Sequence, residues 1–337
     1  MSKVVRPPKL KPIDLGARPG DETIRGVAPT RTVGETYAPE AKSKLEDYLE
    51  LFKVRVTSLV VLNAWAGFVL AAHKHGASYF SLRLVATLVG VACSSAGAAA
   101  LNQVFERDAD ARMSRTKDRP LPAKRMSARE AFVAARLMII AGTLVLTFEA
   151  NWITGVSAFL TVLAYAFVYT PLKSRTYHAT FVGAFPGGMP PVLGWIAVSG
   201  KYEIETAALF AIVFLWQFPH FLSIGWLYRE DYERGGIRIL PVLDPSGRAT
   251  VRQILLYSLL LLPISLWPFF VGLTGWVYLF GAIAFSIAYL AFGIRLALLR
   301  LPPTSATSKK EARELLRASV VYLPLLLGLL VITGVFH

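Results

Sequence analysis

Residues 82–122 read LRLVATLVGVACSSAGAAALNQVFERDADARMSRTKDRPLP, an apolar run that ends in a dense set of charges. Carboxylates and cations next to an apolar segment are costly to hold near a membrane, so they usually mark a functional site. The stretch therefore predicts a membrane-spanning segment with a polar site at its end. The polar residues are Asn102, Glu106, Asp108 and Asp110, followed by Arg115, Lys117 and Arg119.

The composition of the whole chain supports this interpretation. The 337 residues are 54% hydrophobic and 17% charged, with a mean hydropathy of +0.49, whereas soluble domains average about 25% charged residues. The net charge of +14 lies between apolar runs and in the N-terminal arm, which favours a membrane-topology bias over nucleic-acid binding. Cys93 is the only cysteine, which excludes an intrachain disulfide and a cysteine-based metal site.

Spanning a bilayer takes about 20 apolar residues. The expected fold is an all-α integral membrane protein, a bundle of about nine transmembrane helices. The predicted spans are 54–73, 82–104, 129–148, 152–170, 179–199, 205–226, 251–271, 275–297 and 318–336.

The distribution of Lys and Arg predicts the orientation of this bundle. With nine spans, 32 of the 36 basic residues fall on the side of the N-terminus, and only three fall in loops on the other side. Because basic loops stay in the cytoplasm, we expect a cytoplasmic N-terminus and a multi-pass protein of the bacterial cytoplasmic (inner) membrane. The three loops with most of the polar chemistry, 105–127, 171–178 and 227–248, share that cytoplasmic side.

The N-terminal segment differs from the rest of the chain. Its first 40 residues lack the apolar core of a cleavable signal peptide and are rich in Pro, Gly and charge. We therefore expect a disordered, basic cytoplasmic arm over residues 1–44. Residues 45–337 are expected to form the transmembrane domain.

Asn102, Glu106 and Asp110 form the first candidate site. At positions i, i+4 and i+8 of a helix they share one face. Three oxygen ligands on such a face suit Mg²⁺, which also binds water and substrate phosphate oxygens. The simpler alternative is a solvated helix end whose acids pair with Arg107 and Arg112.

The basic residues nearby predict a bound anion, and the anion expected beside Mg²⁺ is a diphosphate. Pro120 and Pro122 end the helix, so the loop can fold its cations back over the carboxylates. The next inside loop adds two more. The alternative for the basic residues of both loops is the positive charge that cytoplasmic loops usually carry. The candidate anion-binding residues are Arg115, Lys117, Arg119, Lys173 and Arg175.

Two further candidates lie in and just after the sixth predicted span, 205–226. His220 lies in the apolar aromatic segment WQFPHF, where a packed, hydrogen-bonded histidine is the alternative to a ligand. Glu230, Asp231 and Glu233 form a second acidic cluster on the same side as the first, which would let metals hold a diphosphate from two sides. A charged loop balanced by arginines is the alternative there.

These motifs together resemble the UbiA-type intramembrane prenyltransferases, and more narrowly the branch of that family that farnesylates haem. They occur in family order from about residue 45 to the C-terminus. The matching elements are LFKVRVTSLVVLNAWAG, NQVFERDADARMSRTKDRPLP, YTPLKSRT, GAFPGGMPPVLGW, WQFPHF and DYERGGIRILPV.

The resemblance implies a nine-helix bundle around a central cavity open to the cytoplasmic side. It implies Mg²⁺-dependent transfer of the farnesyl group of farnesyl diphosphate to a vinyl group of haem B, and a haem A synthase as a partner. The resemblance implies that Asn102, Glu106 and Asp110 bind Mg²⁺ and diphosphate, and that Asp231 binds a second metal or a neighbouring water. It implies that the diphosphate is neutralised by Arg115, Arg119, Lys173 and Arg175. It places His220 on the haem side, as a candidate ligand of the iron, and lets Lys53 and Arg55 contact phosphate or the haem propionates.

One position departs from the wider family. Many members carry a second D-x-x-x-D run, but here the fourth residue after Asp231 is Gly235, so one Mg²⁺ assisted by cations is the safer expectation. Two other functions stay open, namely a related prenyltransferase for an aromatic acid or quinone precursor and an anion transporter. A transporter should carry polar residues through to the outer side, whereas here they gather on one side.

Overall fold

The computed structural model describes residues 42–336, and within them nine helical segments are long and apolar enough to cross a membrane. This confirms the all-α membrane fold. The predicted arm lies almost entirely outside the described residues. The spans are α2 (Val54–Lys74), α3 (Leu82–Asp110), α4 with η1 (Ala128–Ala150), α5 with η2 and α6 (Trp152–Leu172), α7 (Ala179–Ser199), α8 (Ile204–Leu227), α11 (Arg248–Phe270), α12 (Trp276–Leu298) and α13 (Ala306–Val335).

Three short helices lie outside the spans. These are α1 (Lys44–Leu51), α9 (Arg229–Gly235) and α10 (Leu240–Leu243). Ser43 starts α1 with a capping box, in which its side chain and that of Glu46 each accept a backbone N–H at the helix start. Two spans also contain π-helical stretches, η1 (Leu146–Ala150) and η2 (Ala164–Tyr169).

Two helices are longer than the sequence predicts. The predicted second span ends at residue 104, but α3 continues to Asp110; the predicted ninth span begins at 318, but α13 begins at Ala306. The physical reason is that a hydropathy pattern detects only the apolar part of a helix, which lies in the membrane. Ala, Glu, Lys and Arg are good helix formers, so both helices continue as polar segments beyond their apolar parts.

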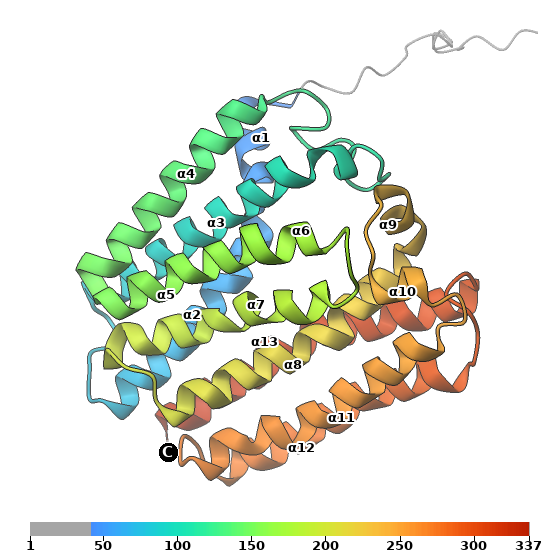
Figure 1. The fold of residues 1–337 in the computed structure, drawn as a ribbon. Helices are drawn as coiled ribbons and strands as arrows, with labels where there is room; N and C mark the ends of the chain where they lie inside the picture. The colour runs from blue at the N-terminus through green and yellow to red at the C-terminus, as the bar shows by residue number, and fades with distance from the viewer. Residues whose placement is uncertain (1–41, 337) are drawn as a thin grey trace, which may run out of the picture. The chain divides into compact units, whose positions relative to one another are not determined.

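The helices that wall the interior come from distant parts of the chain. α2 packs along α7, and α13 packs against both α8 and α2. The loops after α3, α6 and α8 meet at one end of the bundle, at the right of Figure 1, where the backbone N–H of Arg238 bonds to the carbonyl oxygen of Lys173 at 2.7 Å. The topology therefore brings the three predicted polar loops together.

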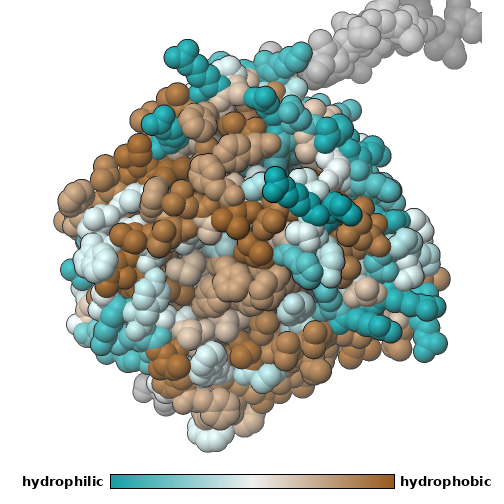
Figure 2. Space-filling model, viewed as in Figure 1, coloured by the Kyte–Doolittle hydropathy of each residue, from teal (hydrophilic) through white to brown (hydrophobic). Residues whose placement is uncertain are grey.

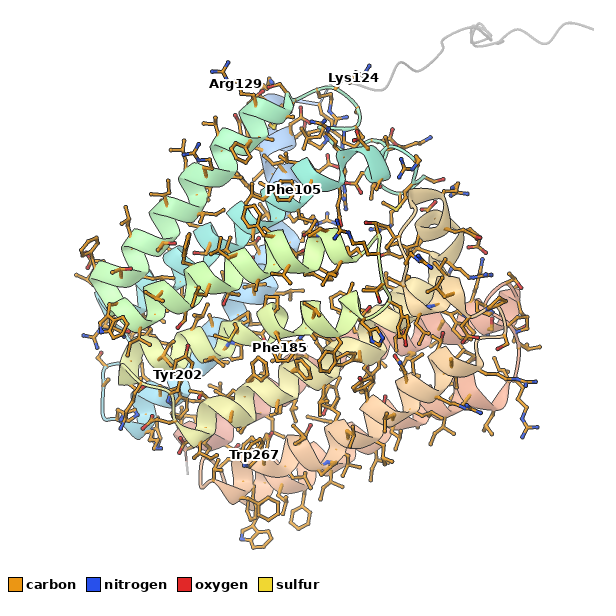
Figure 3. All side chains as sticks on the ribbon, viewed as in Figure 1. Phe105, Lys124, Arg129, Phe185, Tyr202 and Trp267 are labelled. Atoms are coloured by element: carbon orange, nitrogen blue, oxygen red, sulfur yellow. The ribbon has the colours of Figure 1, made fainter. Side chains whose placement is uncertain are left out.

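The surface shows the pattern expected of a membrane protein. On the face in Figure 2, hydrophobic residues cover the sides of the helices and hydrophilic residues gather around the loop end. Phe105 on α3 and Phe185 on α7 expose nearly half of their surface, while Lys124 and Arg129 mark the loop end (Figure 3). Exposed aromatic side chains of this kind suit lipid contact. The chain is therefore a multi-pass membrane protein.

α2 and α7 approach so closely that two glycines have no room for a side chain. A Cβ on Gly194 would lie 1.8 Å from the carbonyl oxygen of Ala64, and one on Gly67 would lie 1.9 Å from that of Pro191. Small residues at such positions let membrane helices pack backbone to backbone. The wall that α2 and α7 share therefore depends on both glycines.

Gly194→Ala is expected to lower the thermal unfolding midpoint of the detergent-solubilised protein, because the added methyl group must push α2 and α7 apart. Overpacking of this kind costs about 1–3 kcal/mol. Gly328→Ala in α13 is the matched control, since a Cβ there meets nothing within 4 Å. Equal midpoints for the two variants would contradict the close α2–α7 contact.

Candidate functional site

A cavity of about 580 Å³ lies inside the bundle, lined by residues of α2, α3, the α5–η2 span, α7, α8 and α13 and of the loops at the polar end. On α3 its wall follows one helix face. Ser94, Ser95, Ala98 and Ala99 are small and leave space. Farther along the same face the wall becomes polar, with Asn102, Glu106 and Asp110.

The three polar residues of α3 are brought together as the sequence predicts. α3 continues through Asp110, so their side chains point to one side of the helix. Asn102 and Asp110 are each only 1% exposed. Buried carboxylates require a partner. The carboxylates of Glu106 and Asp110 are each paired with a cation from outside α3.

Arg119 and Lys173 supply those partners. Arg119 donates to the Asp110 carboxylate at 2.7 Å, which shows that the loop after α3 folds back over the helix end. Lys173 pairs with Glu106 at 2.7 Å, and its ammonium lies 4.5 Å from the centre of the Tyr169 ring. Two predicted anion-binding loops therefore reach the predicted carboxylates.

Lys53 is a third cation beside the polar residues of α3. It lies between α1 and α2 in the left-handed backbone region, with φ of +47°, which costs a residue other than glycine about 1–2 kcal/mol. Its ammonium donates to the Asn102 side-chain oxygen at 3.2 Å. Gln103 holds the preceding turn by donating to the carbonyl oxygens of Glu50 and Leu51 at 3.1 and 2.7 Å.

Positive charge exceeds negative charge in the lining of this cavity. Four cations, Lys53, Arg115, Arg119 and Lys173, face two carboxylates, those of Glu106 and Asp110. Removal from water, together with the Arg119 and Lys173 cations, lowers the pKa of Lys53 to about 7. An anion bound nearby would stabilise the charged form of this buried lysine. The polar end of the cavity is therefore suited to an anionic group.

Asp231 is placed differently from the other predicted metal ligands. It is buried but outside the cavity lining. Its two carboxylate oxygens accept the backbone N–H groups of Ser114 and Arg115 at 3.1 and 3.2 Å, and Arg234 also donates to it. Burial alone would raise the pKa of Asp231, but these hydrogen bonds hold it below its usual value. Its predicted role as a metal ligand stays a prediction.

His220 lines the cavity on α8 beside aromatic rings. Its Nδ1 is 2.7 Å from the hydroxyl of Ser319 on α13, and its ring stacks on that of Trp216 with centroids 4.7 Å apart. Trp216 is held in turn, because its indole N–H donates to the Ser319 carbonyl oxygen at 2.8 Å. The arrangement fixes the imidazole and leaves Nε2 as the nitrogen available to a ligand.

Three other predicted binding residues lie away from the cavity. Arg55, Lys117 and Arg175 are exposed and do not line it. Arg55 follows Lys53 by two residues and therefore lies on another side of the chain, and Arg175 follows Lys173 in the same way. Their roles in substrate binding stay predictions.

Several residues in the cavity wall or directly behind it carry no sequence signal of their own. The Asn102 amide donates to the Thr170 hydroxyl at 3.3 Å, and Tyr165 and Tyr169 from the π-helical stretch line the cavity beside Lys173. A π-helical stretch changes which side chains share a face, so the ordinary helical period does not place these tyrosines. Only Pro171 after Thr170 marks the segment as irregular.

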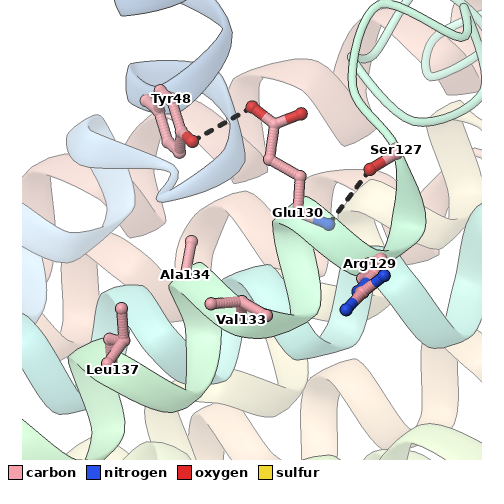
Figure 4. A pocket seen from close by; sticks show the side chains of 7 residues that line it. All are labelled: Tyr48, Ser127, Arg129, Glu130, Val133, Ala134 and Leu137. Carbon is pink, nitrogen blue, oxygen red and sulfur yellow. Dashed lines mark hydrogen bonds between the residues drawn. The ribbon is translucent and has the colours of Figure 1, made fainter.

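A second, shallower pocket lies between α1 and α4 (Figure 4). There the Tyr48 hydroxyl donates to Glu130 at 3.1 Å, and Ser127 caps α4 by accepting the Glu130 backbone N–H at 3.1 Å. The Tyr48–Glu130 bond attaches α1 to α4. The lining contains one Arg and one Glu, without the group of cations and carboxylates that marks the cavity.

The donor set of the cavity fits Mg²⁺ that also binds a substrate. Asn102, Glu106 and Asp110 supply hard oxygen atoms from one helix face. Within residues 42–336, no three His, Cys, Asp or Glu side chains gather closely enough to form a metal site alone. Since Mg²⁺ usually keeps waters and uses one or two carboxylates together with phosphate oxygens, this set suits an ion that arrives with a diphosphate.

Comparison with known proteins agrees with these features. The model of the UbiA prenyltransferase family matches residues 60–334. A relative named protoheme IX farnesyltransferase from Koribacter versatilis strain Ellin345 is 46% identical over 294 residues, which are 87% of this chain and 95% of that protein.

Solved structures share the fold. A structure of digeranylgeranylglyceryl phosphate synthase superposes with a TM-score of 0.70 at 17% identity, over 87% of this chain and 99% of that one. A UbiA homologue from Archaeoglobus fulgidus, bound to DMAPP and Mg²⁺, gives a TM-score of 0.55 at 15% identity, over 82% of this chain and 99% of that one.

Proposed function

Because the chain belongs to the UbiA prenyltransferase family, we propose that it transfers the farnesyl group of farnesyl diphosphate to a vinyl group of haem B, with Mg²⁺ as cofactor. One observation carries the proposal. One cavity combines the carboxamide and carboxylates of Asn102, Glu106 and Asp110 with an excess of cations, and the rest of its lining is mostly apolar.

The polar end is assigned to the diphosphate. Asn102, Glu106 and Asp110 would hold Mg²⁺, which supplies positive charge to the leaving group when bound. Lys53, Arg119 and Lys173 already lie within hydrogen-bonding distance of those three residues. Cations fixed in advance at the place where negative charge develops stabilise a transition state without reorganising. Phosphate oxygens can replace their present partners, which are one carboxamide oxygen and two carboxylates.

The apolar part is assigned to the farnesyl chain. The small residues of α3, Ser94, Ser95, Ala98 and Ala99, provide the space. When the C–O bond of farnesyl diphosphate breaks, the electron pair leaves with the diphosphate and C1 becomes electrophilic. The vinyl carbon then bonds to C1, water adds to the resulting cation, and the proton released passes to the diphosphate. An apolar lining keeps other water away from C1 until the vinyl group reacts.

The haem is assigned to the side of His220. Histidines that bind a metal usually have the second ring nitrogen fixed by a hydrogen bond, as Ser319 fixes Nδ1 here. Trp216 and Phe221, both in the cavity lining, add flat apolar rings that suit a porphyrin. His220 Nε2 is thus the proposed ligand of the haem iron.

The orientation and partners follow from the charges and the product. The basic loops gather at the end with α9 and α10 (Figure 1), which supports a cytoplasmic location for that end and for the N-terminus in an inner membrane. Farnesyl diphosphate would enter from this side or from the lipid. Handover of the product to a haem A synthase stays a prediction.

Removal of Mg²⁺ is the direct test of the donor site. Purified protein with farnesyl diphosphate and haem B is expected to release diphosphate only when Mg²⁺ is present, because Glu106 and Asp110 can hold the diphosphate oxygens only through the ion. EDTA should stop the release, and excess Mg²⁺ should restore it. Release at the full rate in EDTA would contradict the proposed metal. Release with a quinone precursor but not with haem would favour the aromatic-acceptor alternative.

A further inference from the structure

α9 and the loop after α3 hold each other through the Asp231 side chain. One carboxylate oxygen accepts the Ser114 N–H and the other accepts the Arg115 N–H. Arg234 donates to the same carboxylate and also to the Ser114 hydroxyl at 2.9 Å. Both oxygens of Asp231 are thus engaged by donors of this chain.

The loop after α3 also donates hydrogen bonds to α9. Arg112, on the loop side, donates to the carbonyl oxygens of Arg234 and Gly235 at 3.2 and 2.9 Å. Gly235 also leaves room for Met113, since a Cβ there would lie 3.0 Å from the Met113 side chain. α9 and residues 112–115 therefore form one hydrogen-bonded unit, which we call the α9 clasp.

The α9 clasp determines where the Arg115 side chain lies. The backbone of Arg115 is bound to Asp231, and its guanidinium lies 5.3 and 5.7 Å from the ring centres of Tyr228 and Tyr232. Arg115 lines the cavity, while Asp231 does not. Asp231 is thus connected to the cavity through the loop that it holds.

From this geometry we propose that Asp231 is a positioning residue, which holds Arg115 over the diphosphate end of the cavity, and not a metal ligand. The proposal rests on the proposed function for its consequence, which is weaker binding of farnesyl diphosphate when the clasp opens. Two backbone N–H groups and an arginine occupy three of the roughly four acceptor positions of the Asp231 carboxylate, so a cation that bound both oxygens would have to displace these donors. The glycine at position 235, where the wider family has a second acid, serves the close contact with Met113.

Asp231→Asn tests the proposal with two measurements. Hydrogen exchange of the peptide over residues 111–119 should become faster by about tenfold or more, because a lost hydrogen bond to a charged acceptor corresponds to at least that factor. The KM for farnesyl diphosphate should rise more than kcat falls, and the Mg²⁺ concentration for half-maximal activity should stay within about twofold of the parent value.

Glu233→Gln is the matched control, since it removes one negative charge from the same short helix at an exposed position. It should change neither exchange nor KM. Unchanged exchange in Asp231→Asn, with a raised Mg²⁺ requirement, would show a metal ligand and overturn the proposal. Faster exchange with an unchanged KM would overturn the link between the clasp and the substrate.

Arg112→Ala provides a second route that leaves the Asp231 carboxylate intact. It should speed exchange in the same peptide and raise the same KM, and it would remain informative if Asp231→Asn did not fold. No effect of Arg112→Ala on exchange or KM would overturn the proposal. Exchange is measured without turnover, so an inactive parent protein would count against farnesyl transfer but leave the clasp testable.

Discussion

Asp110→Asn is expected to reduce farnesyl transfer by at least about a hundredfold while the protein still inserts into the membrane. The change keeps the size of the side chain but removes the charge that would bind Mg²⁺ and that orients Arg119 at 2.7 Å. Loss of a single preorganised electrostatic group costs about 10²–10³ in kcat in other enzymes. Product formation per unit of folded protein, with Mg²⁺ saturating, measures the effect.

Asp108→Asn is the matched control for this prediction. It changes the same charge two residues earlier on α3, but the Asp108 side chain is 82% exposed and pairs only with Arg107 among the described residues. It should keep nearly full activity. Breaking the buried Asp110–Arg119 pair also destabilises the fold, by about 3–5 kcal/mol in comparable cases, so unfolding midpoints are measured alongside. Full activity in Asp110→Asn would remove Asp110 from the site.

His220→Ala is expected to weaken haem binding by about tenfold or more, which corresponds to about 1.4 kcal/mol. The reason is loss of the only imidazole among the described residues that lines the cavity. The absorbance spectrum of bound haem should also change, because the iron would lose its proposed protein ligand. Titration of the purified protein with haem B measures both effects.

His178→Ala is the control for this change, since His178 is an exposed histidine at the loop end. Its haem affinity and spectrum should match those of the parent protein. Ser319→Ala should produce a smaller shift than His220→Ala, because it removes only the hydrogen bond that fixes Nδ1. Unchanged haem titration of His220→Ala would show that the histidine serves packing alone.

The sequence predicts the spans and the first half of the site for a clear physical reason. Lipid demands long apolar runs, and each run was visible in the chain. Asn102, Glu106 and Asp110 are spaced four residues apart. They therefore share one face of α3, which continues to Asp110. The fold-back of Arg119 was also predicted, but for the wrong reason: α3 already ends at Asp110, ten residues before Pro120, so the prolines do not end the helix.

The remaining parts depend on contacts between distant segments, which no local pattern encodes. Asp231 resembles Asp110 in the sequence, as an acid among charges after an apolar helix, yet it binds backbone N–H groups of another loop. Lys173 and Arg175 are equally basic, but only Lys173 reaches Glu106. The extra polar turns of α13 were missed because hydropathy does not detect helix beyond the lipid.

The mass of the haem in cells that express the protein tests the central claim most directly. Extracted haems are analysed by mass spectrometry from cells with the parent protein, with Asp110→Asn and with an empty vector. The proposed function predicts a haem that is heavier than haem B by one farnesyl group and one hydroxyl group, present only with the parent protein. Haem B alone in all three cultures, with the parent protein folded in the membrane, would contradict it.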